Sequence, residues 1–214
     1  MTSQSSRFGV IKKSEPTMKS RRYDAELSFT QPVKIAARAF RKGIPSDAIA
    51  HAEVYPSLST GKTITLAHQF SPRYPASGGN ALVDGFRGGL NYRDGFWQGY
   101  EGIDVEAVVD LGQVRQISRV TTRYLQDTRM WIFYPTSIEY SVSIDGTNFD
   151  QVSRSEQAVA AKDEGPSIKE FDHHLKDVKA RFVKVLAKSV GVCPPWHPGA
   201  GGKAWLFLDD ITVQ

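Results

Sequence analysis

The stretch that decides the fold is residues 138–149, which read IEYSVSIDGTNF. Apolar side chains at every second position from Ile138 to Ile144 alternate with polar ones, a period of two that places successive side chains on opposite faces of a β-strand. The Asp145-Gly146 step that follows tolerates the positive φ angles of a tight hairpin turn. These residues therefore predict a strand with one face in the core and the other in water, followed by a hairpin.

Further strands are expected outward from this hairpin, wherever β-branched and aromatic residues gather in short runs. Four such runs are Val105–Leu111, Ile117–Tyr124, Ala180–Lys188 and Ala204–Val213. Helical periodicity is nowhere sustained for three turns. Short strands separated by turns, with no helices between them, favour an antiparallel β-sandwich over a parallel sheet.

Two shorter strands are expected upstream, around Val33–Phe40 and Ala48–Val54, joined by a turn that Gly43 and Pro45 mark. Because two strands alone are marginally stable, this segment either packs on the rest or is the remnant of a larger sheet. Residues 1–24 are rich in Ser, Lys and Arg without apolar periodicity, which predicts a flexible basic tail.

Composition excludes several classes of function. The 214 residues include 27 Lys and Arg against 23 Asp and Glu, a net charge of +4, and much of the excess lies in the first 22 residues. The remainder is close to neutral, so a basic face for nucleic acid is not predicted. Cys193 is the only cysteine, which excludes an intrachain disulfide. The sequence has no apolar run long enough to span a membrane and no secretory signal, so as written it predicts a cytoplasmic chain.

Three motifs occur in an order typical of one known family: Asn80–Gly85, Val108–Gly112 and Ser141–Phe149. Through them the chain, from residue 68 to 214, resembles the coagulation factor 5/8 type C (discoidin) domains, which are also classified as family 32 carbohydrate-binding modules. The resemblance implies an all-β fold, an antiparallel jelly-roll β-sandwich of the galactose-binding-like kind.

A narrower resemblance rests on Tyr74–Gly85, Trp97–Tyr100, Trp131–Pro135 and Trp196–Phe207. These stretches are similar to the C-terminal module of Bacteroidetes-type β-N-acetylhexosaminidases of glycoside hydrolase family 20. Tyr23–Val54 is similar to the second half of the small immunoglobulin-like unit before that module.

The two resemblances together imply a domain organisation and a set of partners. The parts are a tail at 1–24, a partial immunoglobulin-like (chitobiase C-terminal-like) β segment at 25–56 and a discoidin-like carbohydrate-binding sandwich at 65–214. The implied partners are a glycan containing N-acetylhexosamine or galactose and the catalytic hydrolase domain of a parent protein. The family is periplasmic or extracellular, unlike the location that the sequence as written predicts.

The discoidin resemblance also implies a structural Ca²⁺ ion, which takes six to eight oxygen ligands from carboxylates and backbone carbonyls. Carried over by motif, these are the side chains of Asp84 and Asp210 and the carbonyls of Ala81, Phe86 and Asp209. A glutamate is usual in the family where Asp210 stands, and the long loop up to Phe96 leaves the other ligands unassigned. The alternative is that Asp84 caps a turn and Asp210 ends a strand, without a metal.

Aromatic residues in turn-flanked stretches are the candidate sugar-binding groups, because sugar C–H groups stack on flat rings while the hydroxyls need polar partners. The candidates are Trp97, Tyr100, Arg123, Trp131, Trp196 and His197. The last two, between Pro195 and Pro198, are expected in an exposed loop. Core packing is an equal alternative for Trp97 and Trp131, and Trp205 is expected in the core.

Catalysis has little support in the sequence. Family 20 hydrolases use an adjacent Asp-Glu pair on a barrel strand, and the only such pair is Asp163-Glu164, in a polar stretch typical of a solvated loop. The favoured interpretation is a non-catalytic carbohydrate-binding module of a hexosaminidase-like hydrolase, binding glycans through loop aromatics. The alternative is a structural spacer without ligand affinity.

Overall fold

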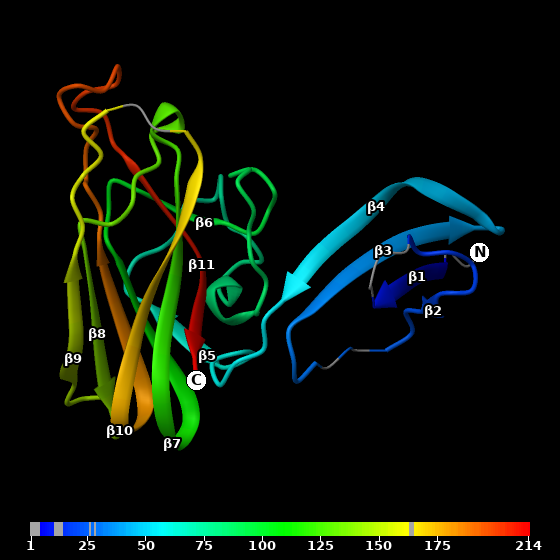
Figure 1. The fold of residues 1–214 in the computed structure, drawn as a ribbon, viewed down its shortest axis with the longest axis horizontal. Helices are drawn as coiled ribbons and strands as arrows, with labels where there is room; N and C mark the ends of the chain where they lie inside the picture. The colour runs from blue at the N-terminus through cyan, green and yellow to red at the C-terminus, as the bar shows by residue number, and fades with distance from the viewer. Residues whose placement is uncertain (1–4, 11–14, 26, 28, 163–164) are drawn as a thin grey trace. The chain divides into compact units, whose positions relative to one another are not determined.

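The computed structural model describes residues 5–10, 15–25, 27, 29–162 and 165–214, and it divides the chain into two compact units, Met1–Pro56 and Ser57–Gln214. Every pairing between the strands of the described residues is antiparallel. The helices among these residues are two three-residue 3₁₀ turns, neither of which could cross a bilayer. The prediction of an all-β antiparallel fold is therefore confirmed (Figure 1).

The first unit is a four-stranded sheet in the order β2-β1-β3-β4. Its strands are β1 (Ser5–Val10), β2 (Arg21–Arg22), β3 (Val33–Arg41) and β4 (Ile44–Val54). The two-residue turn between β3 and β4 has positive φ at Lys42 (51°) and Gly43 (86°), as a type I′ hairpin requires. Pro45 lies in β4 rather than in the turn, which an edge strand allows because it needs no donor on its outer side.

Part of the expected tail at residues 1–24 belongs to this sheet. β1 pairs with β3 from Ser5 against Phe40 to Val10 against Ile35, and β2 pairs with β1. The physical reason is that β3 would otherwise be an unpaired edge, with a row of free backbone donors and acceptors. The tail prediction overlooked this because backbone pairing needs no apolar periodicity.

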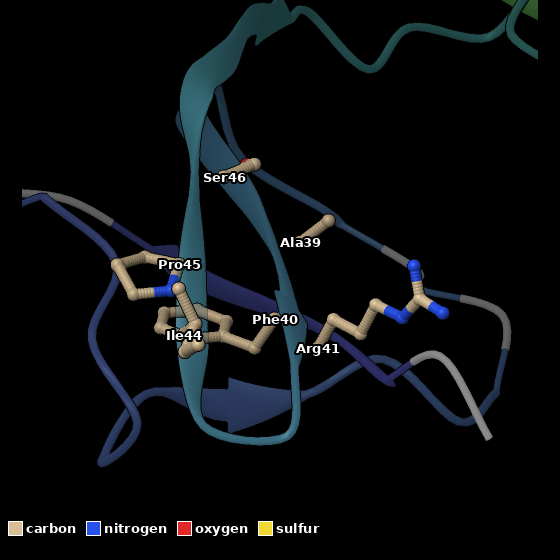
Figure 2. A pocket seen from close by; sticks show the side chains of 6 residues that line it. All are labelled: Ala39, Phe40, Arg41, Ile44, Pro45 and Ser46. Carbon is tan, nitrogen blue, oxygen red and sulfur yellow. The ribbon is translucent and has the colours of Figure 1, made fainter. Parts of the chain in front are cut away.

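The hairpin of the first unit carries a small pocket of about 240 Å³. Phe40 and Pro45 are register partners across it, and Figure 2 shows the Phe40 ring beside Ile44 and Pro45 while the Arg41 side chain extends away. Phe40 is buried, whereas 72% of Ile44 is exposed. Among the residues that the structure describes, the pocket is therefore mainly the apolar face of a hairpin, lined also by Arg41 and Ser46.

The second unit is built on seven strands, in the order β6-β11-β7-β10-β8-β9 with β5 paired to β7. They are β5 (Thr63–Leu66), β6 (Gln98–Glu101), β7 (Val105–Gln126), β8 (Ser137–Ser143), β9 (Asp150–Glu156), β10 (Ser167–Lys188) and β11 (Trp205–Val213). The 3₁₀ turns are η1 (Ala81–Val83) and η2 (Thr128–Met130).

Two long strands, β7 and β10, run through both layers of this sandwich. They pair from Ser167 against Gln126 to Ala187 against Val105, and Figure 1 shows them side by side in green and orange. The first half of β7 and second half of β10 lie between β5 and β8, and the second half of β7 lies between β11 and the first half of β10. Residues 112–116, with Gly112 at φ 83°, form an exposed bend between the halves. The two strands predicted at 105–111 and 117–124 are thus one bent strand.

The core lies between the two layers. One cluster of buried side chains combines Ile138 and Tyr140 of β8 with Val120 and Tyr124 of β7 and other residues from both layers. The predicted strand at 138–144 is confirmed over 137–143, with its alternate apolar residues buried. Its serines, which were expected on the water face, are buried as well, and Ile144 is exposed because it lies in the turn beyond the strand.

The Tyr140 hydroxyl ties the two layers together. It lies 2.6 Å from the Thr122 hydroxyl of β7 and donates to the Phe171 carbonyl of β10 at 3.0 Å. A buried hydroxyl with two partners fixes how the layers face each other.

Candidate functional site

A bulge in β11 brings two acidic side chains to one place. Leu208 pairs with Tyr124 and Asp210 with Arg123, so Asp209 is an extra residue in the ladder. The bulge breaks the alternation of faces that two successive residues of a regular strand would show. Both carboxyl groups consequently meet the loop of residues 84–89, Asp209 through Gly88 and Asp210 through Arg87.

Two arginines partly compensate these carboxylates. Arg123 pairs closely with Asp209, and the Nε of Arg87 lies 3.3 Å from Oδ2 of Asp210. Glu170 of β10 contacts both guanidinium groups, at 3.1 and 3.3 Å. With Asp84 nearby, the cluster holds four carboxyl groups and two arginines, so it has an excess of negative charge.

Burial dominates the electrostatics of this acidic cluster. It raises the pKa of Asp210 to about 6 and that of Asp209 to about 8, in each case against the opposing effect of the neighbouring arginine. Burial also raises the pKa of Asp84, while the hydroxyl of Ser77 and the amide of Phe86 oppose the shift. The Asp84 charge is a further, smaller contribution to the raised pKa of Asp210.

The acidic residues among the predicted calcium ligands, Asp84, Asp209 and Asp210, belong to this cluster or border it. Asp84 follows η1 and accepts hydrogen bonds from the Ser77 hydroxyl and, at 2.8 Å, from the amide of Phe86. The carbonyl of Ala81 accepts a hydrogen bond from the amide of Asp84 at 3.4 Å. Oδ1 of Asp209 is buried without a hydrogen-bond partner. Within the described residues, no group of three His, Cys, Asp or Glu side chains is arranged to hold a metal, so backbone carbonyls would have to complete a site.

Two of the predicted sugar-binding aromatics lie inside the protein. Trp97 and Tyr100 are each 1% exposed, the first packed with Leu125 and Phe207 and the second in the main core. The Trp97 indole donates to the carbonyl of Gly89 at 2.9 Å. The expectation that these rings are presented to a sugar is corrected here, because Trp97 directly precedes β6 and Tyr100 lies in it, and both side chains point into buried clusters.

Arg123 is also engaged in the protein. Besides Asp209 and Glu170, its guanidinium donates to the carbonyl of Gly88 at 3.2 Å and lies 5.7 Å from the centre of the Trp97 ring. Its donors are therefore directed at this loop and the acidic cluster rather than at a free surface.

The other three candidates come together from two loops. The ring centres of Trp131 and Trp196 lie 5.7 and 5.5 Å from that of His197. His197 is 4% exposed, its Nε2 lies 2.7 Å from the Thr128 carbonyl, and its Nδ1 accepts the amide of Gly199. Trp196 is half-buried and donates to the Ala160 carbonyl. The exposed-loop prediction for His197 is therefore wrong, because the prolines fold this loop back onto the structure.

Trp131 is the exposed member of the three. It is 39% exposed and sits at φ 65° as the residue that ends η2. Its ring lies against two glycines, since a Cβ at Gly199 would be 2.3 Å from Cζ2 and one at Gly202 would be 2.6 Å from Cζ3. The glycines thus leave room for a flat indole at the surface.

A groove of about 390 Å³ lies near this loop. It is lined by Arg73, Tyr74, Pro75, Ala76, Tyr92, Arg93, Gly95 and Trp97. Tyr74 packs edge-on against Tyr92 and Trp205, at 6.0 and 5.1 Å between ring centres. Tyr92 also lies 3.5 Å from the sulfur of Met130, one residue before Trp131.

Sequence reasoning missed this groove. Tyr74 stood within a quoted motif and Tyr92 within the loop left unassigned, but residues 18 positions apart give no periodic signal of contact. The cluster of aromatic residues with arginines in that loop was the available hint. The groove and the Trp131 loop together can offer ring faces and guanidinium donors to a ligand. The Asp163-Glu164 pair considered for catalysis lies outside the described residues.

Comparisons with known proteins agree with the architecture. The family model described as F5/8 type C domain matches residues 63–206. None of the curated protein sequences matches the chain.

The solved structures that are similar to it include three carbohydrate-binding modules. The chitosan-binding module 1 of a chitosanase/glucanase from Paenibacillus sp. IK-5 is 19% identical, with a TM-score of 0.45 over 75% of this chain and 99% of that chain. A fucose-binding module from Streptococcus pneumoniae is 15% identical, with a TM-score of 0.46 over 74% and 94%. The module CpGH89CBM32-5 from Clostridium perfringens, in complex with GalNAc-β-1,3-galactose, is 23% identical, with a TM-score of 0.46 over 74% and 99%.

Proposed function

The chain belongs to the F5/8 type C domain family, and on that premise we propose that it is a non-catalytic module that binds carbohydrate at the groove and at Trp131. The observation that carries the proposal is the groove itself, with the partly exposed rings of Tyr74 and Tyr92 in its walls and two arginines beside them. Ring faces stack on sugar C–H groups, and guanidinium groups donate to sugar hydroxyls. Its volume lies within the range of about 300–1,000 Å³ that is usual for small-ligand sites.

The finer part of the proposal names the glycan and the setting. The ligand is a glycan containing N-acetylhexosamine or galactose, and the module acts beside the catalytic domain of a family 20 β-N-acetylhexosaminidase. A module tethered to an enzyme raises the local concentration of a polymeric substrate by multivalency. Genomic DNA upstream of the Met1 codon that encodes such a domain in frame supports this setting, and an unrelated upstream gene contradicts it.

The binding experiment is affinity-gel retardation on matrices that carry N-acetylglucosamine, N-acetylgalactosamine or galactose. We expect retardation of the full chain, and a loss of about tenfold in affinity in Tyr92→Ala and Trp131→Ala. Ile144→Ala is the matched control, because Ile144 is 61% exposed and lies in the β8–β9 turn. Unretarded migration on every matrix would contradict the proposal and favour the spacer alternative.

Calcium is part of the same proposal. Asp84 and Asp210 are two neighbouring carboxyl groups whose pKa values burial raises, and Asp209 has a buried oxygen without a partner. An oxygen-seeking divalent cation fits this donor set, with the carbonyls of Ala81, Phe86 and Asp209 as further ligands. Its role is structural: it neutralises the negative excess that the two arginines leave.

Thermal unfolding with and without chelator tests the calcium site. We expect EDTA to lower the melting temperature of the full chain, added Ca²⁺ to restore it, and Asp84→Ala to abolish the shift. Asp150→Ala is the control, since Asp150 is an exposed carboxyl at the start of β9. A melting temperature that EDTA leaves unchanged excludes a structural calcium ion.

A further inference from the structure

We propose that the groove between residues 73–76 and 92–97 recognises acidic saccharides, through Arg73 and Arg93. This inference rests on the proposed function, and it names the class of glycan that the groove prefers. The shared chemistry is a sugar ring that carries an anionic oxygen group, either a carboxylate or a sulfate.

Arg73 and Arg93 differ from most other arginines of the second unit. Arg87, Arg119, Arg123, Arg154 and Arg181 each pair with Asp or Glu side chains. Among the residues that the structure describes, neither Arg73 nor Arg93 forms an ion pair. Both are exposed. Two guanidinium groups at one groove therefore have hydrogen-bond donors available for a ligand.

Aromatic rings hold both guanidinium groups in place. The Cζ of Arg93 lies 4.9 Å from the centre of the Tyr92 ring, and that of Arg73 lies 6.0 Å from the centre of the Trp205 ring. Stacking on a ring leaves the N–H edge of the guanidinium plane free, which is the edge that binds a carboxylate or a sulfate in bidentate fashion. The rings thereby reduce the freedom that each arginine would lose on binding.

No acidic side chain among the described residues competes inside the groove. The eight lining residues include two arginines and no Asp or Glu, a formal charge of +2. The acidic residue next to Arg93 in the sequence is Asp94, whose carboxylate accepts hydrogen bonds from two backbone amides. Its Oδ2 accepts from the amide of Gly89 at 2.6 Å and its Oδ1 from the amide of Phe96 at 3.0 Å. The groove therefore combines positive charge with aromatic walls, whereas the acidic cluster around Asp209 has the opposite charge.

Isothermal titration of the full chain with three matched oligosaccharides tests the inference: a neutral one, its hexuronate counterpart and its sulfated counterpart. We expect at least one acidic ligand to bind about tenfold more tightly than the neutral one. Most of that difference should be lost at a salt concentration of about 1 M, where the screening length falls to about 3 Å. The two acidic arms distinguish carboxylate from sulfate.

The variants are Arg73→Gln, Arg93→Gln and the pair combined. Each single change is expected to weaken acidic-ligand binding about tenfold and neutral-ligand binding less than about twofold, because it removes a charge-assisted hydrogen bond and leaves the rings. Arg73→Lys and Arg93→Lys keep the charge and should retain part of the affinity. Arg115→Gln is the control, because Arg115 is an exposed arginine on the bend of residues 112–116.

The outcomes separate the two proposals. Equal binding of neutral and acidic ligands, unaffected by the arginine variants, overturns the preference for acidic saccharides and leaves carbohydrate binding intact. Binding of acidic ligands that falls equally in Arg115→Gln also overturns it, because the effect is then one of net charge. If none of the three oligosaccharides binds, both the preference and the proposed function are refuted.

Discussion

Gly88→Ala should destabilise the second unit, because Trp97 leaves no room for a methyl group. An ideal Cβ at Gly88 would lie 2.3 Å from Nε1 and 2.4 Å from Cε2 of Trp97. An ordinary contact between carbon atoms is about 3.5–4.0 Å, so one group must move by more than about 1 Å. Gly88 is not among the glycines with positive φ, so the expected effect is steric rather than a backbone effect.

The magnitude follows from what surrounds the ring. Trp97 is 1% exposed and packs with Leu125, Ile132 and Phe207, so it cannot swing into solvent. Overpacking of a rigid core typically costs about 1–3 kcal/mol, and displacing the indole from the Gly89 carbonyl adds about 1 kcal/mol. The free energy of unfolding should therefore fall by about 2–4 kcal/mol.

Urea denaturation of the single variants and of a double-mutant cycle measures this effect. Gly89→Ala, at the adjacent residue, is a matched control, because a Cβ at Gly89 would contact only Oδ2 of Asp94, at 3.5 Å. We expect it to change the free energy of unfolding by less than about 0.5 kcal/mol. In Trp97→Phe the smaller ring should recover part of the Gly88→Ala loss. A Gly88→Ala loss no larger than that of Gly89→Ala, or a cycle without coupling, would refute the reasoning.

Three further predictions concern pH, a buried hydroxyl and the exposed indole. In buffer with chelator, Asp209 and Asp210 should make the free energy of unfolding fall as the pH rises from about 4 to 8, because their raised pKa values mean that the folded state holds protons in this range that the unfolded state has released. The slope should not exceed about 1.4 kcal/mol per pH unit for each group, and urea titrations in which stability rises across this range would contradict it. Tyr140→Phe should lower the free energy of unfolding by about 1–3 kcal/mol in the same assay, because it leaves the buried Thr122 hydroxyl and Phe171 carbonyl without this hydrogen-bond partner. An unchanged urea midpoint would contradict this prediction. Gly199→Ala should displace the ring of Trp131 and weaken glycan retardation about tenfold, with less than about 1 kcal/mol lost in stability, whereas unchanged retardation would mean that this ring is not a contact.

The strands were the part of the fold that sequence could predict. Alternation at 138–143 and runs of β-branched residues located β8 and β11, because those patterns reflect burial on a pleated surface. The bend at Gly112 could not be recognised as continuous strand, since residues 112–116 are all exposed and carry no apolar alternation. Pairing of Ser5–Val10 with β3 depends on backbone atoms, which carry no side-chain signal.

The candidate site divides in the same way. The motifs pointed to Asp84, Asp209 and Asp210, and the structure places Asp209 and Asp210 at a bulge of β11 against the loop that begins at Asp84, while their role as calcium ligands stays a prediction. The sequence around the loop aromatics did not predict which of them are exposed. Trp97 and His197 are buried and Trp131 is exposed, although all three stand in turn-flanked stretches. What separates them is the packing of distant segments, which one sequence does not display.

The strands β7 and β10, which both layers share, determine how the sandwich unfolds. Because β7 and β10 each supply half of their length to either layer, one layer cannot lose its order without removing the central pair of the other. The expected behaviour is a single all-or-none melting of residues 57–214, with amides on either sheet exchanging hydrogen at one common slow rate. Folding should be correspondingly slow, because the β7–β10 pairing joins residues far apart in sequence, such as Val105 and Ala187.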